Sequence, residues 1–190
     1  MQNSFLIIVV LLNFQIGISS SSWEGSKDEV VSLLQEYINI NTSNPPGDVT
    51  KAVWWIEKLL DKHFIDYQTF TVEENPTRMH LLAQIKGSNS KLKPLLLLNH
   101  MDVVPADKQA WNIDPFKSSI VDSVVYGRGS LDMKGMGIMQ LITLIKLKKE
   151  GWKPERTVKV LCVADEEVLG EYGAKWMIDN HWDLLDPEWV

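Results

Sequence analysis

The chain has 190 residues, of which 45% are hydrophobic and 23% are charged, a composition typical of a globular protein with room for one domain core. Its net charge of −6 and the lack of a basic patch argue against nucleic acid as a partner. The single cysteine, Cys162, excludes a disulfide within the chain.

The N-terminal segment differs in character from the rest of the chain. Residues 1–22 contain no charged side chain, and Phe5–Leu12 is an unbroken apolar run followed by small residues. This layout predicts a secretory signal peptide that is cleaved between Ser19 and Trp23. A membrane anchor is the alternative, but the run is short for a membrane span. We therefore expect a secreted or lumenal protein, whether extracellular, vacuolar or lysosomal.

Apolar residues at helical spacing predict a first helix at 26–40, and the turn-forming segment NTSNPPG at 41–47 ends it. A second amphipathic helix follows Asp48. Alternating or continuous apolar runs predict strands at 67–72, 81–85, 95–99, 124–129 and 157–164.

A further helix is predicted at 136–149, with Met139, Ile142 and Ile145 facing inward, and a last one at 173–181. Strands that are separated by helices are typical of α/β domains. The sequence therefore predicts an α/β fold with a largely parallel sheet that is flanked by helices.

Three polar clusters each follow a predicted strand. They are NHMD at 99–102, GRGSLDMKG at 127–135 and ADEE at 164–167. From His100 to Asp132 is 32 residues, and from Asp132 to Glu167 is 35, about one strand–helix unit each. Ligands of open parallel sheets bind beyond the carboxyl ends of the strands. We therefore expect the three clusters to meet in one crevice.

One histidine and several carboxylates suit a divalent metal ion better than a serine or cysteine nucleophile. The candidate ligands are His100, Asp132, Glu166 and Glu167, whose negative charges would be costly to hold close without a cation. Asp102 can accept the other ring N–H of His100 and fix its tautomer. Adjacent glutamates on an extended backbone diverge, so one can bind metal while the other acts as general base on a water.

Each cluster also has a simpler interpretation. His100 alone could be a capping histidine, the DEE run a solvated loop, and GRGSLD a turn. A GxGxxG-like nucleotide loop is another alternative, but Asp132 occupies its third glycine position and would repel a pyrophosphate. The combination of the three clusters at strand ends favours a metal site.

At these residues the sequence resembles a known family. HMDVVP, YGRGSLDMKG and DEE, in this order and spacing, are similar to the motifs of the zinc-dependent amidohydrolases and exopeptidases. That family includes aminoacylase, carboxypeptidase S, acetylornithine deacetylase and succinyl-diaminopimelate desuccinylase. The resemblance runs from about Asp28 to Val190 and includes TSNPPG and WNIDPF.

The resemblance implies hydrolysis of an amide bond in N-acyl-amino acids or small peptides at a site with two Zn²⁺ ions, for which Co²⁺ or Mn²⁺ could substitute. It implies that His100 binds one metal, that Asp132 bridges both and that Glu167 binds a metal. Glu166 would be the general base, and Asp102 would orient His100. It leaves a homodimer open for a full-length protein.

The resemblance also implies a zinc-exopeptidase-like catalytic domain, of which residues 23–190 are the N-terminal part, truncated before the lid or dimerisation domain. Members carry a further acidic ligand and a further histidine downstream, so this sequence supplies at most three inner ligands for two metals. A catalytically inactive truncated product with a partial metal site is therefore the alternative. Metal-free hydrolysis of carbohydrate by paired carboxylates is a third hypothesis, which leaves His100 and Asp102 unexplained.

Overall fold

The computed structural model describes residues 26–190, so the predicted signal peptide lies outside the described residues. The described part begins with two helices, α2 (Ser26–Ile38) and α3 (Thr50–Lys62), where the apolar spacing predicts them. The main strands are β1 (Asp66–Thr71), β2 (Met79–Ile85), β3 (Leu95–His100) and β6 (Val158–Val163). The other elements are η1 (Lys108–Ala110), β4 (Ser119–Val121), β5 (Val124–Tyr126), α4 (Lys134–Lys149), η2 (Glu166–Val168) and α5 (Ala174–Leu185).

The four main strands form one sheet in the order β1-β2-β6-β3. β3 and β6 are parallel, while β2 is antiparallel to both of its neighbours. The α/β class is confirmed, but the sheet is mixed. β1 and β2 are antiparallel because only residues 72–78 connect them, whereas a parallel pair needs a crossover of a dozen or more residues. The α4 segment provides such a crossover between β3 and β6.

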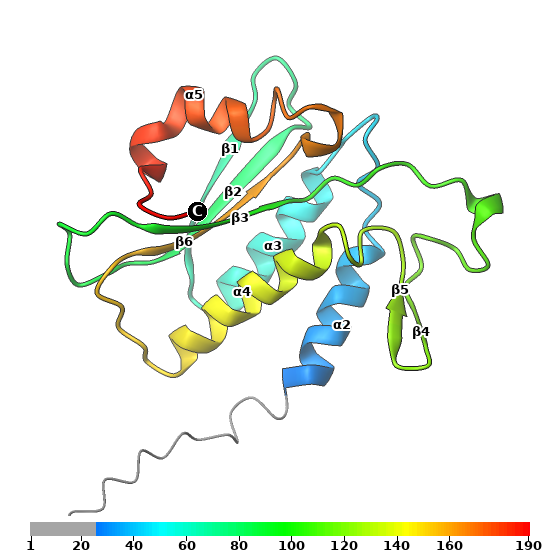
Figure 1. Cartoon of the computed structure of the whole chain (residues 1–190), viewed down its shortest axis with the longest axis horizontal. Helices are drawn as coiled ribbons and strands as arrows, with labels where there is room; N and C mark the ends of the chain where they lie inside the picture. The colour runs from blue at the N-terminus through cyan, green and yellow to red at the C-terminus, as the bar shows by residue number, and fades with distance from the viewer. Residues whose placement is uncertain (1–25) are drawn as a thin grey trace, which may run out of the picture.

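Helices cover both faces of the sheet (Figure 1). The larger apolar core lies between the sheet and α2, α3 and α4, and a smaller one lies under α5. Because strand side chains alternate, Val160 and Cys162 of β6 join the larger core, while Leu161 and Val163 join the smaller one. Both faces of β6 are therefore buried, as its continuous apolar sequence indicates.

β4 and β5 form a separate two-stranded hairpin (Figure 1). The strand predicted at 124–129 therefore ends at Tyr126 and does not join the main sheet. The polar cluster that follows it leads directly into α4.

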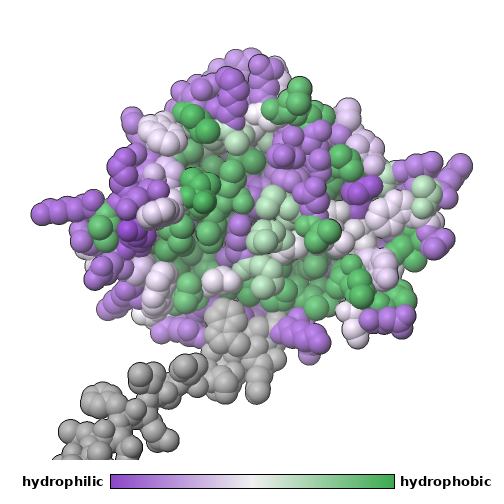
Figure 2. All heavy atoms as spheres, in the orientation of Figure 1, coloured by the Kyte–Doolittle hydropathy of each residue, from purple (hydrophilic) through white to green (hydrophobic). Residues whose placement is uncertain are grey.

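Figure 2 shows apolar residues interspersed with hydrophilic ones on one face of the molecule. Exposed apolar side chains include Met136 and Met139 of α4. Met139 was expected to face inward, and this expectation was wrong. Among the helices of residues 26–190, none has the length and apolarity to cross a membrane.

Candidate metal centre

The site lies at the carboxyl end of the parallel pair β3 and β6. His100 is the last residue of β3 and pairs in register with Val163 of β6. Asp102 follows β3 by two residues, and η2, with Glu166 and Glu167, follows β6. Two of the three polar clusters thus extend from neighbouring strand ends, as expected. The third reaches the site differently, because Asp132 lies in the loop before α4 and not at a strand end of this sheet.

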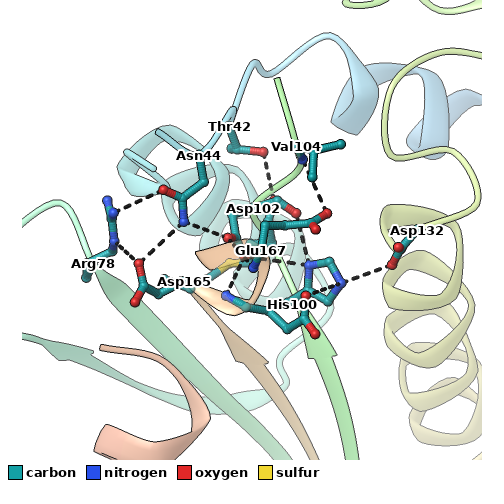
Figure 3. Close-up of polar contacts among 12 residues, drawn as sticks. Thr42, Asn44, Arg78, His100, Asp102, Val104, Asp132, Asp165 and Glu167 are labelled. Carbon is teal, nitrogen blue, oxygen red and sulfur yellow. Dashed lines mark hydrogen bonds and ion pairs between the residues drawn. The ribbon is translucent and has the colours of Figure 1, made fainter. Parts of the chain in front are cut away.

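His100 is almost fully buried, with 6% of its side chain exposed, and its two ring nitrogens face different partners. Nδ1 lies 3.0 Å from the backbone oxygen of Asp102 and 3.6 Å from its carboxylate Oδ1. Nε2 lies 3.1 Å from Asp132 Oδ1 (Figure 3). It also lies 3.7 Å from Glu166 Oε2. Asp102 therefore holds the ring, most closely through its carbonyl oxygen, and Nε2 is directed toward the acidic side chains.

Burial alone would lower the pKa of His100, but hydrogen bonds to the side chain and backbone of Asp102, and then to Asp132, raise it to about 9. The raised pKa means that the neighbouring carboxylates favour a positive charge at this position. A metal ligand must present a neutral nitrogen, so a bound cation would take over the positive charge that a ring proton supplies.

Glu166 and Glu167 both approach His100. Ligand atoms of these three residues lie within 4.8 Å of one another. The sequence argument assumed an extended backbone, on which adjacent side chains diverge. The chain instead forms a 3₁₀ turn here, which begins after Asp165 in the left-handed conformation (φ +70°). Both glutamates are therefore available to the same cation.

The two glutamates differ in their surroundings. Glu167 Oε1 accepts a hydrogen bond from the Val104 backbone N–H at 3.2 Å. Burial, followed by the charge of Asp132, raises the pKa of Glu167, against the effect of His100. The Glu166 side chain is 59% exposed and so has more open access to solvent.

Asp132 is 75% exposed and contacts His100, although it is not part of the group of three. Its loop is anchored by Lys134, a fully buried lysine at the start of α4. Lys134 Nζ donates to the carbonyl oxygen of Tyr37, in the last turn of α2, at 3.0 Å and to that of Ile40, just beyond the helix, at 2.6 Å. Burial lowers the pKa of Lys134 to about 7.

Three further buried residues that the sequence interpretation did not assign to the site adjoin it (Figure 3). Asn44 Nδ2 donates to Asp102 Oδ2 at 2.8 Å and to Asp165 Oδ1 at 3.3 Å. Arg78 Nε contacts Asp165 Oδ1 at 2.7 Å, and its Nη2 donates to Asn44 Oδ1 at 3.2 Å. The NPPG segment marked Asn44 only as part of a turn, and nothing in the sequence near Arg78 indicates that it is buried.

The donor set fits a divalent transition metal. One imidazole and carboxylate oxygens are ligands that zinc, cobalt and manganese accept. His100 has the arrangement of a metal-binding histidine, since one ring nitrogen is held by the protein and the other faces the acidic groups. His100, Asp132, Glu166 and Glu167 could therefore hold a cation at this edge of the sheet.

Comparison with known proteins agrees with this geometry. Residues 96–189 match peptidase family M20/M25/M40. The chain is 35% identical to pig (Sus scrofa) aminoacylase-1 over 149 residues, which are 78% of this chain and 36% of that protein. It is 37% identical to a probable succinyl-diaminopimelate desuccinylase of Staphylococcus aureus over 157 residues, which are 82% of this chain and 36% of that protein. The chain thus spans just over a third of the length of these curated relatives.

Solved structures share the fold. Human carnosine dipeptidase 1 superimposes with a TM-score of 0.73 at 19% identity, over 86% of this chain and 38% of that one. An M20 family metallo-carboxypeptidase from Sulfolobus solfataricus gives 0.72 at 24% identity, over 84% and 36%. A Bacillus subtilis protein described as a dinuclear metal-binding M20 peptidase gives 0.55 at 18% identity, over 80% and 38%. By its motifs, fold and relatives, the chain belongs to peptidase family M20/M25/M40.

Proposed function

We propose that the protein is a metal-dependent hydrolase that cleaves an amide bond in N-acyl-amino acids or small peptides, and that this chain carries part of its catalytic centre. The observation that carries the proposal is the convergence of His100 Nε2 with the carboxylates of Glu166 and Glu167 beyond the ends of β3 and β6. The kinship with aminoacylase-1 supports the substrate class.

In this proposal His100, Asp132 and Glu167 hold the metal, and zinc is the ion that we favour. When bound, the metal supplies a Lewis acid that polarises the scissile carbonyl group and lowers the pKa of water. Glu166, the more exposed of the two glutamates, takes the proton from the attacking water and returns it to the amine that leaves. Asp102 keeps the His100 ring in the tautomer that leaves Nε2 free for the metal.

The substitution Glu166→Gln tests the role of the base. It removes the proton acceptor but keeps the size of the side chain, so we expect turnover of an N-acetyl-amino acid to fall about 100-fold or more while bound zinc remains. Zinc content by mass spectrometry and initial rates of amine release are the measurements. Glu171→Gln is the matched control, because Glu171 is exposed and lies outside the group of three.

Loss of zinc in Glu166→Gln would reassign Glu166 as a ligand. A protein that binds no zinc and releases no amine before any substitution would contradict the proposed function itself.

We also propose that the protein is secreted or lumenal, on the ground of the uncharged apolar segment at 1–22. The N-terminal residue of the mature protein tests this. A start between Ser19 and Trp23 supports the proposal, and a mature protein that retains Met1 contradicts it.

A further inference from the structure

The buried side chain of Asn44 connects the two acidic residues behind the metal centre. Its Nδ2 group has two hydrogens, and each has an acceptor, one on Asp102 and one on Asp165. Its oxygen accepts from Arg78. Every polar atom of this side chain is thus engaged, and 2% of the residue is exposed. Asn44 therefore sets the spacing between two buried carboxylates that would otherwise repel each other.

Asp102 connects Asn44 to the two glutamates through hydrogen bonds to their backbone. Its Oδ1 accepts the backbone N–H of Glu166 at 3.2 Å, and its Oδ2 accepts that of Glu167 at 3.1 Å. Hydrogen bonds to a carboxylate are stronger than those between neutral groups. The position of the Asp102 carboxylate consequently determines where the turn that carries both glutamates begins.

Asp165 fixes the same turn from the other side. Its side chain contacts Arg78 and accepts the Tyr172 backbone N–H at 3.1 Å, and its carbonyl oxygen accepts the Gly170 N–H at 2.7 Å. These contacts stabilise the left-handed backbone at Asp165, which a residue other than glycine adopts at a cost. That conformation turns the chain from β6 into η2 and so toward His100.

Arg78 balances the charge of this group. It is 6% exposed and reaches Asp165, Asn44 and the Pro46 carbonyl group at once. A buried carboxylate that loses its partner is strongly destabilised, so the planar, permanently charged guanidinium suits this position better than a flexible amine.

We propose that Asn44, Arg78 and Asp165 form a positioning unit for the metal centre, which fixes the Asp102 carboxylate and thereby the Glu166–Glu167 turn. None of the three is proposed as a metal ligand. The proposal rests on the proposed function, because it assigns these residues a task only if the glutamates serve a metal.

The substitution Asn44→Leu tests the unit, because it removes both donors and the acceptor at similar size and without a change of charge. We expect the affinity for Co²⁺ to fall about 10- to 100-fold and the visible absorption spectrum of bound Co²⁺ to change. Thr42→Val is the matched control. Thr42 is a buried residue of the same loop whose side chain donates a hydrogen bond to the Met101 carbonyl group and not to Asp102 or Asp165. A folded Asn44→Leu protein with the spectrum and affinity of the control would overturn the proposal.

Arg78 provides a second, independent variant. Arg78→Met should weaken Co²⁺ binding, and Arg78→Lys should recover part of the loss because it restores a positive charge beside Asp165. Equal Co²⁺ affinity in the two variants and the unaltered protein would count against the unit.

Amide hydrogen exchange tests the same idea without metal. In the unaltered protein the Glu166 and Glu167 amides should be protected to an extent close to that of the β6 amides, and in Asn44→Leu they should exchange at least tenfold faster while β6 is unchanged. Unprotected glutamate amides in the unaltered protein would overturn the positioning unit. If the unaltered protein binds no Co²⁺, the proposed function fails, and the exchange data still decide this inference.

Discussion

At the scale of single residues, the sequence indicated the candidate metal ligands, but it did not indicate the buried residues Asn44 and Arg78 that contact the acidic groups behind them. His100, Asp102 and the two glutamates stand out because polar residues directly follow apolar strands. Asn44 and Arg78 act across 58 and 87 positions of sequence, on Asp102 and Asp165 respectively. No local pattern encodes a contact over such a separation, so these residues emerge only from the fold.

His80 illustrates how burial at this scale leads to a pH effect. The residue is fully buried in β2, where its Nδ1 accepts the Ala164 N–H at 3.3 Å and its ring stacks on Trp176. Burial, followed by the charge of His181, lowers the pKa of His80 to about 4, against the effects of Asp165 and the Tyr172 backbone. The folded state therefore resists a proton that the unfolded chain binds near pH 6.5.

We expect this difference to weaken the fold in acid. Above about pH 6.5 the His80 ring is neutral in both the folded and the unfolded state, so it does not affect the free energy of unfolding. As the pH falls from about 6.5 to about 4, the free energy of unfolding should decrease by up to about 3 kcal/mol. Urea unfolding at pH 7.5 and pH 5 measures it. His80→Asn keeps an acceptor for Ala164 but does not titrate, so its stability should depend less on pH over this range. The same slope in both proteins would rule out His80 as the cause.

At the scale of elements, the type of each segment follows from its apolar spacing, and the errors arise where the spacing is uninformative. The strands at 81–85 and 95–99 and the helix at 26–40 were predicted close to their bounds. α4 is apolar around most of its circumference, so periodicity identified its inner face only in part. The structure buries Ile142 and Ile145, as predicted, and exposes Met139.

This difference between faces of α4 predicts unequal effects of truncation. Leu141→Ala removes a fully buried side chain from the larger core and should lower the free energy of unfolding by about 2–5 kcal/mol. Met139→Ala, at a position that is 54% exposed, should lower the free energy of unfolding by much less than Leu141→Ala does. Chemical denaturation of the two variants measures both. Similar losses would show that Met139 is packed in the folded protein.

At the scale of the whole molecule, the fold places the site by bringing two strand ends into register, and this much followed from the sequence. What did not follow is the mixed character of the sheet, because the order of strands depends on which connections can cross over. The strand ends that carry the candidate ligands belong only to the parallel pair β3 and β6, so the antiparallel pairing of β2 does not alter where these residues lie.

If the folded protein binds zinc and the unfolded chain does not, zinc should stabilise the whole fold. At 100 times the dissociation constant the gain is about 2.7 kcal/mol, seen as a higher melting temperature that a chelator reverses. His100→Ala should lose most of this gain, whereas His63→Ala, a substitution at the end of α3 and outside the site, should keep it. Zinc-dependent stabilisation that persists in His100→Ala would place the cation elsewhere.

The strand order also has a consequence for a chain that is still being synthesised. Among the sheet strands of residues 26–190, β6 follows the other three along the chain, yet it lies between β2 and β3. Until it emerges, the nascent protein holds a β1–β2 hairpin and a separate β3, each with an unpaired edge that can associate with other chains. Because β6 also leads into Glu166 and Glu167, insertion of this one strand joins the β1–β2 hairpin to β3 and brings both glutamates to His100 in the same event.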